Sequence, residues 1–600
     1  METSTITPPA RAVDAATVPE ALRRTAAAHP DGVALRTVDD SVSLTWSEVL
    51  ERVDAIAGGL ADLGVKRGDA VAIMLGNRVE FHLVDLAAAM LGATPFSIYT
   101  TYPADEIRYL IADAGARVTI VETELLAVLQ EARQELPGLE HVIVVDGEGG
   151  EDTVPLSQVE AAQPDFDPSG AAAAIEADDV LTLIYTSGTT GRPKGVELTH
   201  RNVMAAAGAV EQIIQLDPGS RVISWLPAAH IAERMAHHYI PLIYAGTVTV
   251  CPNPGDVVSF LPQVRPTWFF AVPRIWEKMK SGLETMQASQ PEEQRHKAEQ
   301  ALSAAIQRVR LRQRGEPVPD GLEAVVAEAE ETMFAPLRRM LGLDQLRAVN
   351  VGAAPTPVEV LEFFHALGIE VAELWGMSET CGCGLCNRPG EVKIGTVGPP
   401  APGTEVKLAD DGELLVRGAF VMQGYRHQPE RTAEALDDDG WLHTGDIAEI
   451  DDDGFVRIVD RKKELIVNAA GKNMSPANIE AAIKTSSPLI GQACCIGDRR
   501  PYNTALIVLD ADFAPAWAQQ QGIEDTRLDA LAADPRVLEA VQAAVDAANR
   551  HLARVEQIKR FTLLGEDWLP GGDELTPTMK LKRKPIAEKY AEQIESMYSG

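Results

Sequence analysis

The feature that most constrains the fold is the stretch YTSGTTGRPKGV at 185–196. The apolar run VLTLIY at 180–185 leads directly into it, so a strand-like segment ends in a glycine-rich loop. Bare glycine backbone, hydroxyl side chains and a lysine after a strand are typical of a loop that approaches phosphate oxygens. A Walker loop has four residues between its first Gly and Gly-Lys, and then Ser or Thr. Here Gly195 follows Lys194, so the loop is not of that type. Read alone, the segment is equally consistent with a flexible surface turn.

Strands and helices alternate before this loop. Apolar runs predict buried strands at 71–75, 117–122 and 141–146, with helices at 79–92 and 104–115 between them. This alternation predicts an α/β fold with a parallel sheet covered by helices. The segment 147–179 is rich in Gly, Pro, Asp and Ala and has weak periodicity, so we expect a linker or a surface crossing there.

Two later sections differ in texture from the rest of the chain. Residues 281–341 carry apolar positions at helical spacing on both sides of GEPVPDG (315–321), which predicts a charged helical hairpin inserted into the larger domain. From the charged run DRKKEL onward the chain has strands of its own, such as ALIVLD at 505–510. We therefore expect a large N-terminal domain of helix-covered sheets, 1–460, and a small mobile C-terminal α+β domain, 461–600. The hinge between them is expected at 460–463.

The composition excludes some classes of partner. With 54 basic and 88 acidic residues the formal charge is −34, which argues against a nucleic-acid ligand. An anionic nucleotide would need local positive charge, and Arg192 and Lys194 supply it in the loop. No apolar run approaches the ~20 residues of a membrane helix, and no secretory signal is visible. Six irregularly spaced cysteines favour a reducing compartment, so we expect a cytoplasmic protein. Peripheral membrane contact and the oligomeric state stay open.

Four further motifs carry residue types suited to a nucleotide. In LWGMSET (374–380), Trp375 could stack on a base, Ser378 could donate to a phosphate and Glu379 could hold Mg²⁺. GWLHTGD (440–446) ends on Asp446, which is suited to ribose hydroxyls. VDRKKELI (459–466) and LTPTMKLKRKP (575–585) concentrate charge. Read singly, the first is equally consistent with a capped helix start, the second with a hairpin turn and the third with a solvated linker, whereas the fourth alone favours a basic tail.

Taken in order, these motifs resemble the adenylate-forming superfamily, which comprises acyl-CoA synthetases, luciferases and peptide-synthetase adenylation domains. The resemblance covers about 20–590 and rests on the ordered set YTSGTTGRPKG, SWLPAAHIAER, VGAAP, LWGMSET, GELLVRG, GWLHTGD, DRKKELI and a C-terminal lysine. Within the superfamily the chain is most similar to long-chain fatty acid–CoA ligases. The helical section after VPRIWEKM (272–279) and the segments NAAGKNMSPANIE and LTPTMKLKRK carry that resemblance.

The resemblance implies a two-step reaction. A fatty acid carboxylate attacks the α-phosphate of ATP, giving acyl-AMP and pyrophosphate, and the thiol of coenzyme A then displaces AMP. The substrates would be a fatty acid, ATP and CoA, with Mg²⁺ as cofactor held by Thr186 and Glu379. The implied phosphate loop is Thr186, Ser187, Gly188, Thr189, Thr190, Gly191 and Lys194. The implied nucleotide site adds Gly352, Glu373, Leu374, Trp375, Ser378, Asp446, Arg461 and Lys463.

Two further residues are expected to act on the acyl group. Lys580 would reach from the small domain to the charge that develops on the acyl and α-phosphate oxygens, and the domain would rotate at its hinge between the two steps. His230 would be a gate or an orienting group near the acyl carbonyl. Three positions depart from the common pattern: Val467 replaces a Lys, Ser378 replaces a Thr and Met579 replaces a Gly.

CGCGLC at 381–386 allows a metal reading, but a tetrahedral zinc site needs a fourth ligand and usually separated pairs of thiols. Since the stretch directly follows the adenylate motif, lining or packing of the acyl pocket is the favoured interpretation.

Three alternatives to a long-chain CoA ligase remain. The first is a fatty acyl-AMP ligase that loads a carrier protein, and the second is a CoA ligase for medium-chain or aromatic acids. The third is a non-catalytic lipid-binding relative. It would be marked by loss of Lys194, Glu379, Asp446 or Lys580, and all four are present.

Overall fold

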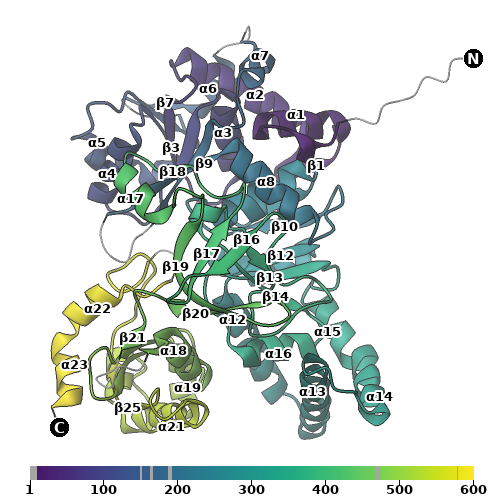
Figure 1. Ribbon diagram of the computed structural model, residues 1–600, viewed down its shortest axis with the longest axis vertical. Helices are drawn as coiled ribbons and strands as arrows, with labels where there is room; N and C mark the ends of the chain where they lie inside the picture. Colours follow the sequence, from purple (N-terminus) through teal and green to yellow (C-terminus); the bar gives the residue numbers. More distant parts are fainter. Residues whose placement is uncertain are drawn as a thin grey trace, which may run out of the picture.

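The computed structural model describes residues 10–148, 150, 152–162, 166–186, 192–467, 473–576 and 579–599. Figure 1 shows a large N-terminal body of helices and sheets, with the C-terminal part of the chain packed below it beside helix α12. Among the described residues, no helix combines the length and the apolar character needed to cross a membrane.

The first sheet is parallel and contains the strands predicted from the apolar runs. Its strands, in spatial order, are β4 (Thr94–Ser97), β3 (Ala70–Met74), β5 (Val118–Val121), β6 (His141–Val144) and β7 (Val154–Pro155). The predicted helices are α3 (Val79–Met90) and α4 (Ala104–Ala114). Helices cover both faces of such a sheet, which is why its strands are continuous apolar runs rather than alternating ones.

Two more sheets complete the body of the large domain. One has the order β10 (Arg221–Ser224), β11 (Thr247–Val250), β1 (Val33–Thr37) and β2 (Ser43–Thr45). The other has the order β12 (Trp268–Ala271), β13 (Ala348–Val351), β14 (Val371–Trp375) and β15 (Leu385–Cys386). The other helices of the large body include α1 (Val18–Ala28), α2 (Trp46–Asp62), α8 (His200–Glu211), α11 (Val257–Val264) and α16 (Val358–Ala366), while α5 (Leu126–Arg133) connects β5 to β6 of the first sheet.

Of the two expectations for 147–179, an unstructured linker is wrong, whereas a surface crossing agrees with the many exposed residues in its described part. The described part of this segment contains β7 and two short helices, α6 (Leu156–Ala161) and α7 (Pro168–Ala173). Helix α6 packs so closely on α2 that a side-chain carbon at Gly59 would lie 1.8 Å from the carbonyl oxygen of Val159. Elements of six residues carry too few apolar positions for their period to be visible in the sequence.

Antiparallel strands carry the motifs. The hairpin of β8 (Val180–Thr186) and β9 (Lys194–Thr199) pairs with β18 (Gly424–Tyr425). A separate sheet has the order β16 (Glu405–Leu408), β17 (Glu413–Arg417), β19 (Leu442–Ile450) and β20 (Val456–Arg461). In Figure 1 this sheet lies between the large body and the C-terminal part, next to α17 (Pro429–Ala435).

The helical section expected at 281–341 is present. Helix α12 (Pro273–Ala288) leads into α13 (Glu292–Gln313), and α14 (Asp320–Ala329) follows the break that GEPVPDG predicted. A π-helical turn (Glu330–Phe334) and α15 (Ala335–Met340) return the chain to β13. Helices α13 and α14 project together from the body in Figure 1.

The C-terminal domain has cores of its own. Strands β23 (Ile490–Ile496), β24 (Asn503–Leu509) and β25 (Ile558–Leu564) form its sheet. A short ladder joins β21 (Ile466–Val467) to β22 (Asn473–Met474). The helices are α18 (Pro476–Thr485), α19 (Phe513–Gln520), α20 (Leu528–Ala533), α21 (Pro535–His551), α22 (Arg583–Lys589) and α23 (Ala591–Tyr598). Two hydrophobic clusters form from residues of 466–597 alone. The predicted α/β class with a large N-terminal and a smaller C-terminal domain is confirmed, whereas the exact boundaries and the hinge stay predictions.

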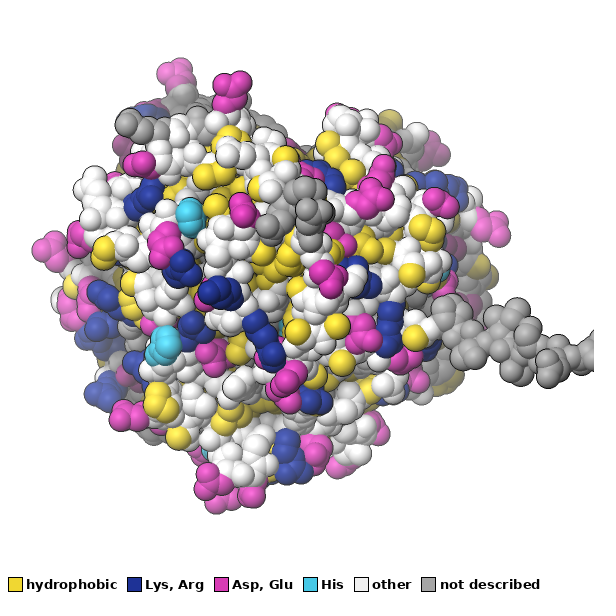
Figure 2. Space-filling model, turned by 90° about the horizontal axis from the view of Figure 1, so that it is seen from above, with side chains coloured by type: hydrophobic (Ala, Val, Ile, Leu, Met, Phe, Trp, Pro, Cys, Tyr) yellow, Lys and Arg dark blue, Asp and Glu magenta, His cyan; other side chains and the backbone are white. Residues whose placement is uncertain are grey.

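The acidic composition does not produce a single-sign surface on the face seen from above. Figure 2 shows Lys and Arg side chains interspersed with Asp and Glu over this face, although the whole chain carries a formal charge of −34. A nucleic-acid footprint is instead a continuous basic patch.

Candidate active site

The stem of the glycine-rich loop is held by helix α4. Thr186 and Lys194 are partners across the β8–β9 hairpin, and Tyr185 lies opposite Gly195. A side-chain carbon at Gly195 would lie 3.1 Å from the Tyr185 ring, so the missing side chain of this glycine leaves room for the ring beside β9. The Tyr185 hydroxyl then donates to the Oδ2 of Asp113 on α4 at 2.8 Å. Five predicted loop residues, Ser187, Gly188, Thr189, Thr190 and Gly191, lie outside the described residues.

Tyr425, which was not among the predicted site residues, contacts both Lys194 and Glu379. The Lys194 ammonium lies 3.8 Å from the centre of the Tyr425 ring, and the Tyr425 hydroxyl donates to Oε1 of Glu379 at 2.8 Å. Burial lowers the pKa of Lys194, while the nearby Glu379 charge opposes this shift. Tyr425 is the last residue of β18, which pairs with β9. Only the run GYR after GELLVRG could have signalled it.

Trp375, Asp446 and Arg461 form the second part of the site. The Trp375 indole N–H donates to Oδ2 of Asp446 at 2.7 Å, and the Arg461 Nε lies 2.9 Å from Oδ1. Asp446 and Arg461 are register partners of β19 and β20. The Asp446 carboxylate raises the pKa of Arg461. Each carboxylate oxygen keeps a free lone pair, so Asp446 can still accept from another hydroxyl.

Lys580 comes to the same place from the C-terminal domain. Leu575 and Leu581 form a bridge that brings the two ends of the lysine loop together, and the Lys580 N–H donates to Oγ1 of Thr576 at 3.0 Å. The Lys580 side chain is exposed to solvent, but nearby protein atoms partly desolvate its ammonium group, and this lowers its pKa. The charges of Arg461, Asp446, Glu464 and Glu379 then act on it.

Met579, which departs from the family pattern, has a φ of +64°. This is the left-handed region, where glycine is unstrained and other residues are not. The geometry therefore explains why a glycine is common in this place.

The expected hinge is tied to both domains. Lys462 pairs with Glu413 of β17 at 2.9 Å, and the Ser475 hydroxyl before α18 donates to Oδ2 of Asp460 at 2.5 Å. Burial raises the pKa of Asp460. Lys463 lies near enough to Lys194 for its charge to lower the pKa of that lysine. The predicted residues Arg461 and Lys463 thus lie at the site.

An apolar pocket adjoins these groups, and CGCGLC lines it. All six residues 381–386 contribute, and helix α8 supplies Ala206, Val210 and, just after its end, Ile213 and Ile214. Burial raises the pKa of the thiols of Cys383 and Cys386 to about 12, so both are uncharged. The six residues therefore line a pocket, and its use for the acyl group stays a prediction. Among the described residues no cluster of three His, Cys, Asp or Glu side chains is placed to hold a metal ion.

His230 lines the same pocket. Burial, with a smaller effect of the Lys580 charge, lowers the pKa of His230 to about 4. Its Nδ1 accepts the Ala232 N–H at 3.2 Å, at the start of α9 (Ile231–Arg234). A neutral imidazole whose Nδ1 accepts carries its proton on Nε2, so His230 offers a hydrogen-bond donor to the pocket and not a base.

Two other predicted nucleotide residues line or flank the apolar pocket. Leu374 lines it, and a side-chain carbon at Gly352 would lie 3.1 Å from the Leu374 carbonyl oxygen. Neighbours on a strand point to opposite faces, so Glu373 does not share the face of Leu374. The backbone at Thr356 and Gly395 hydrogen-bonds the Glu373 carboxylate, but burial raises its pKa to about 7. Its Oε2 has no partner among the described residues.

The residues proposed to hold Mg²⁺ fit a hard cation in part. Glu379 is buried in a 3₁₀ turn (Ser378–Thr380), where Tyr425 occupies only one side of its carboxylate. Thr186 ends β8, beside Lys194 across the hairpin. Magnesium typically takes one or two carboxylates and completes its shell with water and substrate phosphates, so one buried carboxylate beside a phosphate loop suits it.

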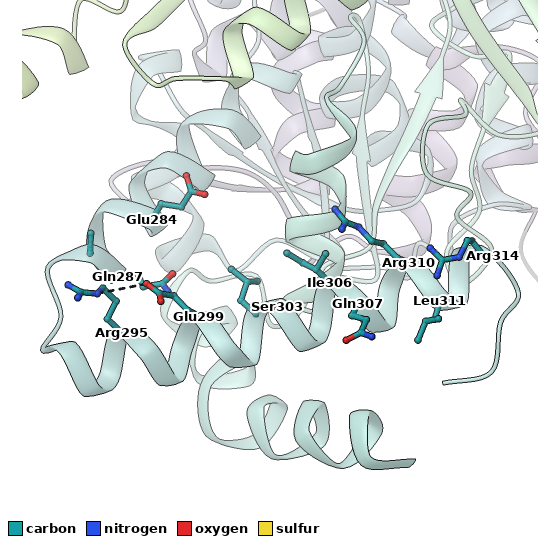
Figure 3. Close-up of a pocket in the computed structure, with 12 residues that line it drawn as sticks. Glu284, Gln287, Arg295, Glu299, Ser303, Ile306, Gln307, Arg310, Leu311 and Arg314 are labelled. Carbon is teal, nitrogen blue, oxygen red and sulfur yellow. Dashed lines mark ion pairs between the residues drawn. The ribbon is translucent and has the colours of Figure 1, made fainter. Parts of the chain in front are cut away.

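A second hollow lies on the helical section and shares no residue with this site. Figure 3 shows that the side chains around it come from α12 and α13, among them Glu284, Ile306 and the ion pair of Arg295 with Glu299. Its open, charged lining differs from the apolar pocket beside His230.

The comparisons with known proteins agree with this geometry. The model of the AMP-binding enzyme family matches residues 22–426, and that of the AMP-binding enzyme C-terminal domain matches 463–600. The chain is 49% identical to fadD11 of Mycobacterium tuberculosis over 436 residues, 72% of this chain and 76% of that protein. It is 36% identical to the long-chain-fatty-acid–CoA ligase FadD15 of Mycobacterium bovis, over 95% of each chain.

A solved structure supports the fold. An anthranilate CoA ligase in complex with anthranoyl-AMP superposes with a TM-score of 0.73 at 21% identity, covering 99% of this chain and 100% of that one. With the matched family models, the ordered motifs and the site that they build, the chain belongs to the AMP-binding enzymes of the adenylate-forming superfamily.

Proposed function

We propose that the protein is a long-chain fatty acid–CoA ligase, which forms an acyl-AMP from a fatty acid and ATP and transfers the acyl group to coenzyme A. The observation that carries this proposal is the convergence of Lys580, Lys194, Glu379 and Asp446 beside one apolar pocket. The whole-length relatives are named long-chain-fatty-acid–CoA ligases, at 36% identity in Mycobacterium bovis and 31% in Xenopus laevis.

The first step brings a carboxylate to a polyphosphate, so cations must offset the repulsion. Lys194 lies at the end of the stem of the glycine-rich loop, and Lys580 lies near Arg461 and Asp446. We assign Lys194 to the leaving pyrophosphate and Lys580 to the oxygens at the acyl and α-phosphate groups. Asp446 accepts from the ribose hydroxyls while Trp375 and Arg461 orient it. Mg²⁺ held by Glu379 and Thr186 would neutralise charge on the phosphates.

The second step needs a different arrangement, because Lys580 occupies the space at which the thiol must attack. We propose that 461–600 turns about 460–463 once acyl-AMP has formed, which withdraws Lys580. Val467 stands where many relatives have a lysine, so we assign this position no part in thioester formation.

The pocket favours an aliphatic acid. Aliphatic side chains such as Ile213, Ile214 and Met235 line it together with Trp268, Phe270, alanines, glycines and uncharged thiols, and His230 is among its few polar side chains. Two alternatives, a carrier-protein acceptor and a shorter or aromatic acid, are tested in the same experiment. Pyrophosphate release is measured with acids of C4 to C20 and an aromatic acid, and thioester is measured with CoA and with an acyl carrier protein. Long-chain acids with CoA should give the highest turnover, and thioester formed only on the carrier protein would overturn the proposal.

A further inference from the structure

Behind the acyl pocket lies a cluster of charged side chains with no access to solvent. Glu233 and Arg234, the last two residues of α9, both have 0% of their surface exposed. A buried charge is costly unless its hydrogen bonds are satisfied, so the partners of these two residues indicate what they hold in place.

Glu233 fastens the start of the loop 225–230. Its Oε1 accepts from the Ser224 hydroxyl at 2.6 Å, and its Oε2 accepts from the Leu226 N–H at 2.9 Å. The Nδ1 of His237 lies 2.6 Å from the same Oε2. One carboxylate therefore joins the end of β10, the loop and the π-helical turn Met235–Tyr239.

Arg234 fastens the middle of the same loop. Its Nε donates to the Ala228 carbonyl at 3.1 Å. Its two other nitrogens donate to Asp85 of α3 at 2.5 Å and to the Ser97 hydroxyl of β4 at 3.0 Å. The guanidinium thus binds both the parallel sheet and its helix. Because the group is planar and rigid, its bond to the Ala228 carbonyl holds the loop at a fixed position relative to them.

His230 is the last residue of this loop, and it faces the pocket rather than the cluster. Past α9, Met235 and Ala236 also line the pocket, while the next side chain, His237, turns back to Glu233. A π-helical turn changes which residues face each side within a few positions, and such turns occur often at functional sites. The pocket wall and the buried cluster are therefore two faces of one short segment.

We propose that Glu233 and Arg234 are positioning residues for His230. They touch no part of the pocket, but by holding Leu226 and Ala228 they set the loop so that the Nε2–H of His230 meets the carboxylate of the fatty acid. This inference rests on the proposed function, because it assumes that an acyl carboxylate enters this pocket.

The test is a double-mutant cycle with Glu233→Gln and His230→Ala. Kinetic constants for hexadecanoic acid and for ATP are measured by pyrophosphate release in the full-length enzyme. Small misplacements of a catalytic group cost up to ~100-fold, so we expect Glu233→Gln to lower kcat/KM for the acid about 10- to 100-fold, with KM for ATP within about twofold. In the His230→Ala background the same change should cost less than about twofold. Additive losses in the two backgrounds would overturn the inference.

Asp54→Asn is the matched control, because it removes a partly buried carboxylate paired with Arg23 at 2.8 Å, away from the loop. It should leave both constants unchanged. Where Glu233→Gln does not fold, Ser224→Ala removes a single hydrogen bond to Glu233. The resulting loss in kcat/KM, expected to be about fivefold because one hydrogen bond is worth ~1 kcal/mol, must likewise vanish in His230→Ala. A wild-type enzyme inactive on every acid would refute the proposed function, whereas an active one with additive losses refutes this inference alone.

Discussion

The indole N–H of Trp375 donates to the Asp446 carboxylate at 2.7 Å, which links the end of β14 in the large body to β19 in the sheet that leads to the hinge. This bond gives the tryptophan a role other than base stacking. It fixes the carboxylate that we assign to the ribose, and it leaves Arg461 to bind the other oxygen of that carboxylate.

Trp375→Phe keeps an aromatic ring and removes this donor. A hydrogen bond to a charged group is worth ~1.5–3 kcal/mol, so KM for ATP should rise about tenfold or more while KM for the fatty acid stays within about twofold. Steady-state kinetics with each substrate varied checks this. Trp517→Phe, at a tryptophan in the C-terminal domain, is the control. An unchanged KM for ATP would show that Trp375 does not orient Asp446 for ATP binding.

Two ion pairs join α12 to the C-terminal domain in the arrangement that brings Lys580 near Asp446 and Glu379. Arg274 pairs with Asp510, and Lys278 pairs with Asp512 at 2.8 Å. Arg274→Glu should therefore slow acyl-AMP formation and not thioester formation. Partly exposed pairs are worth up to ~1 kcal/mol, so the expected loss is about two- to fivefold.

Pyrophosphate release and thiolysis of supplied acyl-AMP measure the two steps separately. The swap Arg274→Glu with Asp510→Arg should restore the first step. Lys280→Glu is the matched control, since Lys280 lies on the same helix but pairs with Glu284 of α12. Equal slowing of both steps in Arg274→Glu would contradict a role in domain placement.

The acyl pocket can be shortened from its α8 wall. Val210→Phe adds aromatic volume beside Ile213 and Ile214. We expect the preferred acid to become shorter and KM for hexadecanoic acid to rise about tenfold, because overpacking an apolar site costs ~1–3 kcal/mol. Val325→Phe on α14, where the side chain is 47% exposed, should change neither. A chain-length profile equal to the wild type's in Val210→Phe would place the acyl chain elsewhere.

Glu373 makes stability depend on pH. Burial raises its pKa from 4.5 to about 7 in the folded protein, so the folded state binds the proton more tightly than the unfolded state does. The resulting stabilisation is present in full below pH 4.5 and is lost as the pH rises through 7.

Glu373→Gln should remove this dependence. From pH 5 to pH 8 the unfolding free energy of the wild type should fall because of Glu373, whereas that of the variant should not. The difference between the two should therefore change in favour of the variant, by on the order of 2–3 kcal/mol. Urea unfolding at several pH values measures the difference. A constant difference over this range would show that Glu373 is ionised throughout.

The sequence predicted those parts that local patterns encode. Continuous apolar runs located β3, β5 and β6, and Asp446, Arg461 and Lys580 lay in ordered motifs that the structure brings together. Residues that act through distant partners were missed. Tyr425 reaches Glu379 only because β18 pairs with β9, and Glu233 gains its role only from a loop folded over it. Strand alternation places the side chains of Glu373 and Leu374 on opposite faces of β14, so the sequence alone separates these two neighbours.

In the proposed reaction, Lys580 acts in the first step and is withdrawn for the second. The most direct test is Lys580→Ala assayed in two half-reactions: acyl-AMP formation from hexadecanoic acid and ATP, and thiolysis of supplied acyl-AMP by CoA. Lys584→Ala, at a solvent-exposed lysine of α22, serves as the control. We predict at least ~100-fold loss in the first half-reaction, the cost typical of removing one group that stabilises transition-state charge, and thiolysis within about threefold of wild type. Equal losses in both half-reactions, or no loss in the first, would contradict a role of Lys580 in acyl-AMP formation alone.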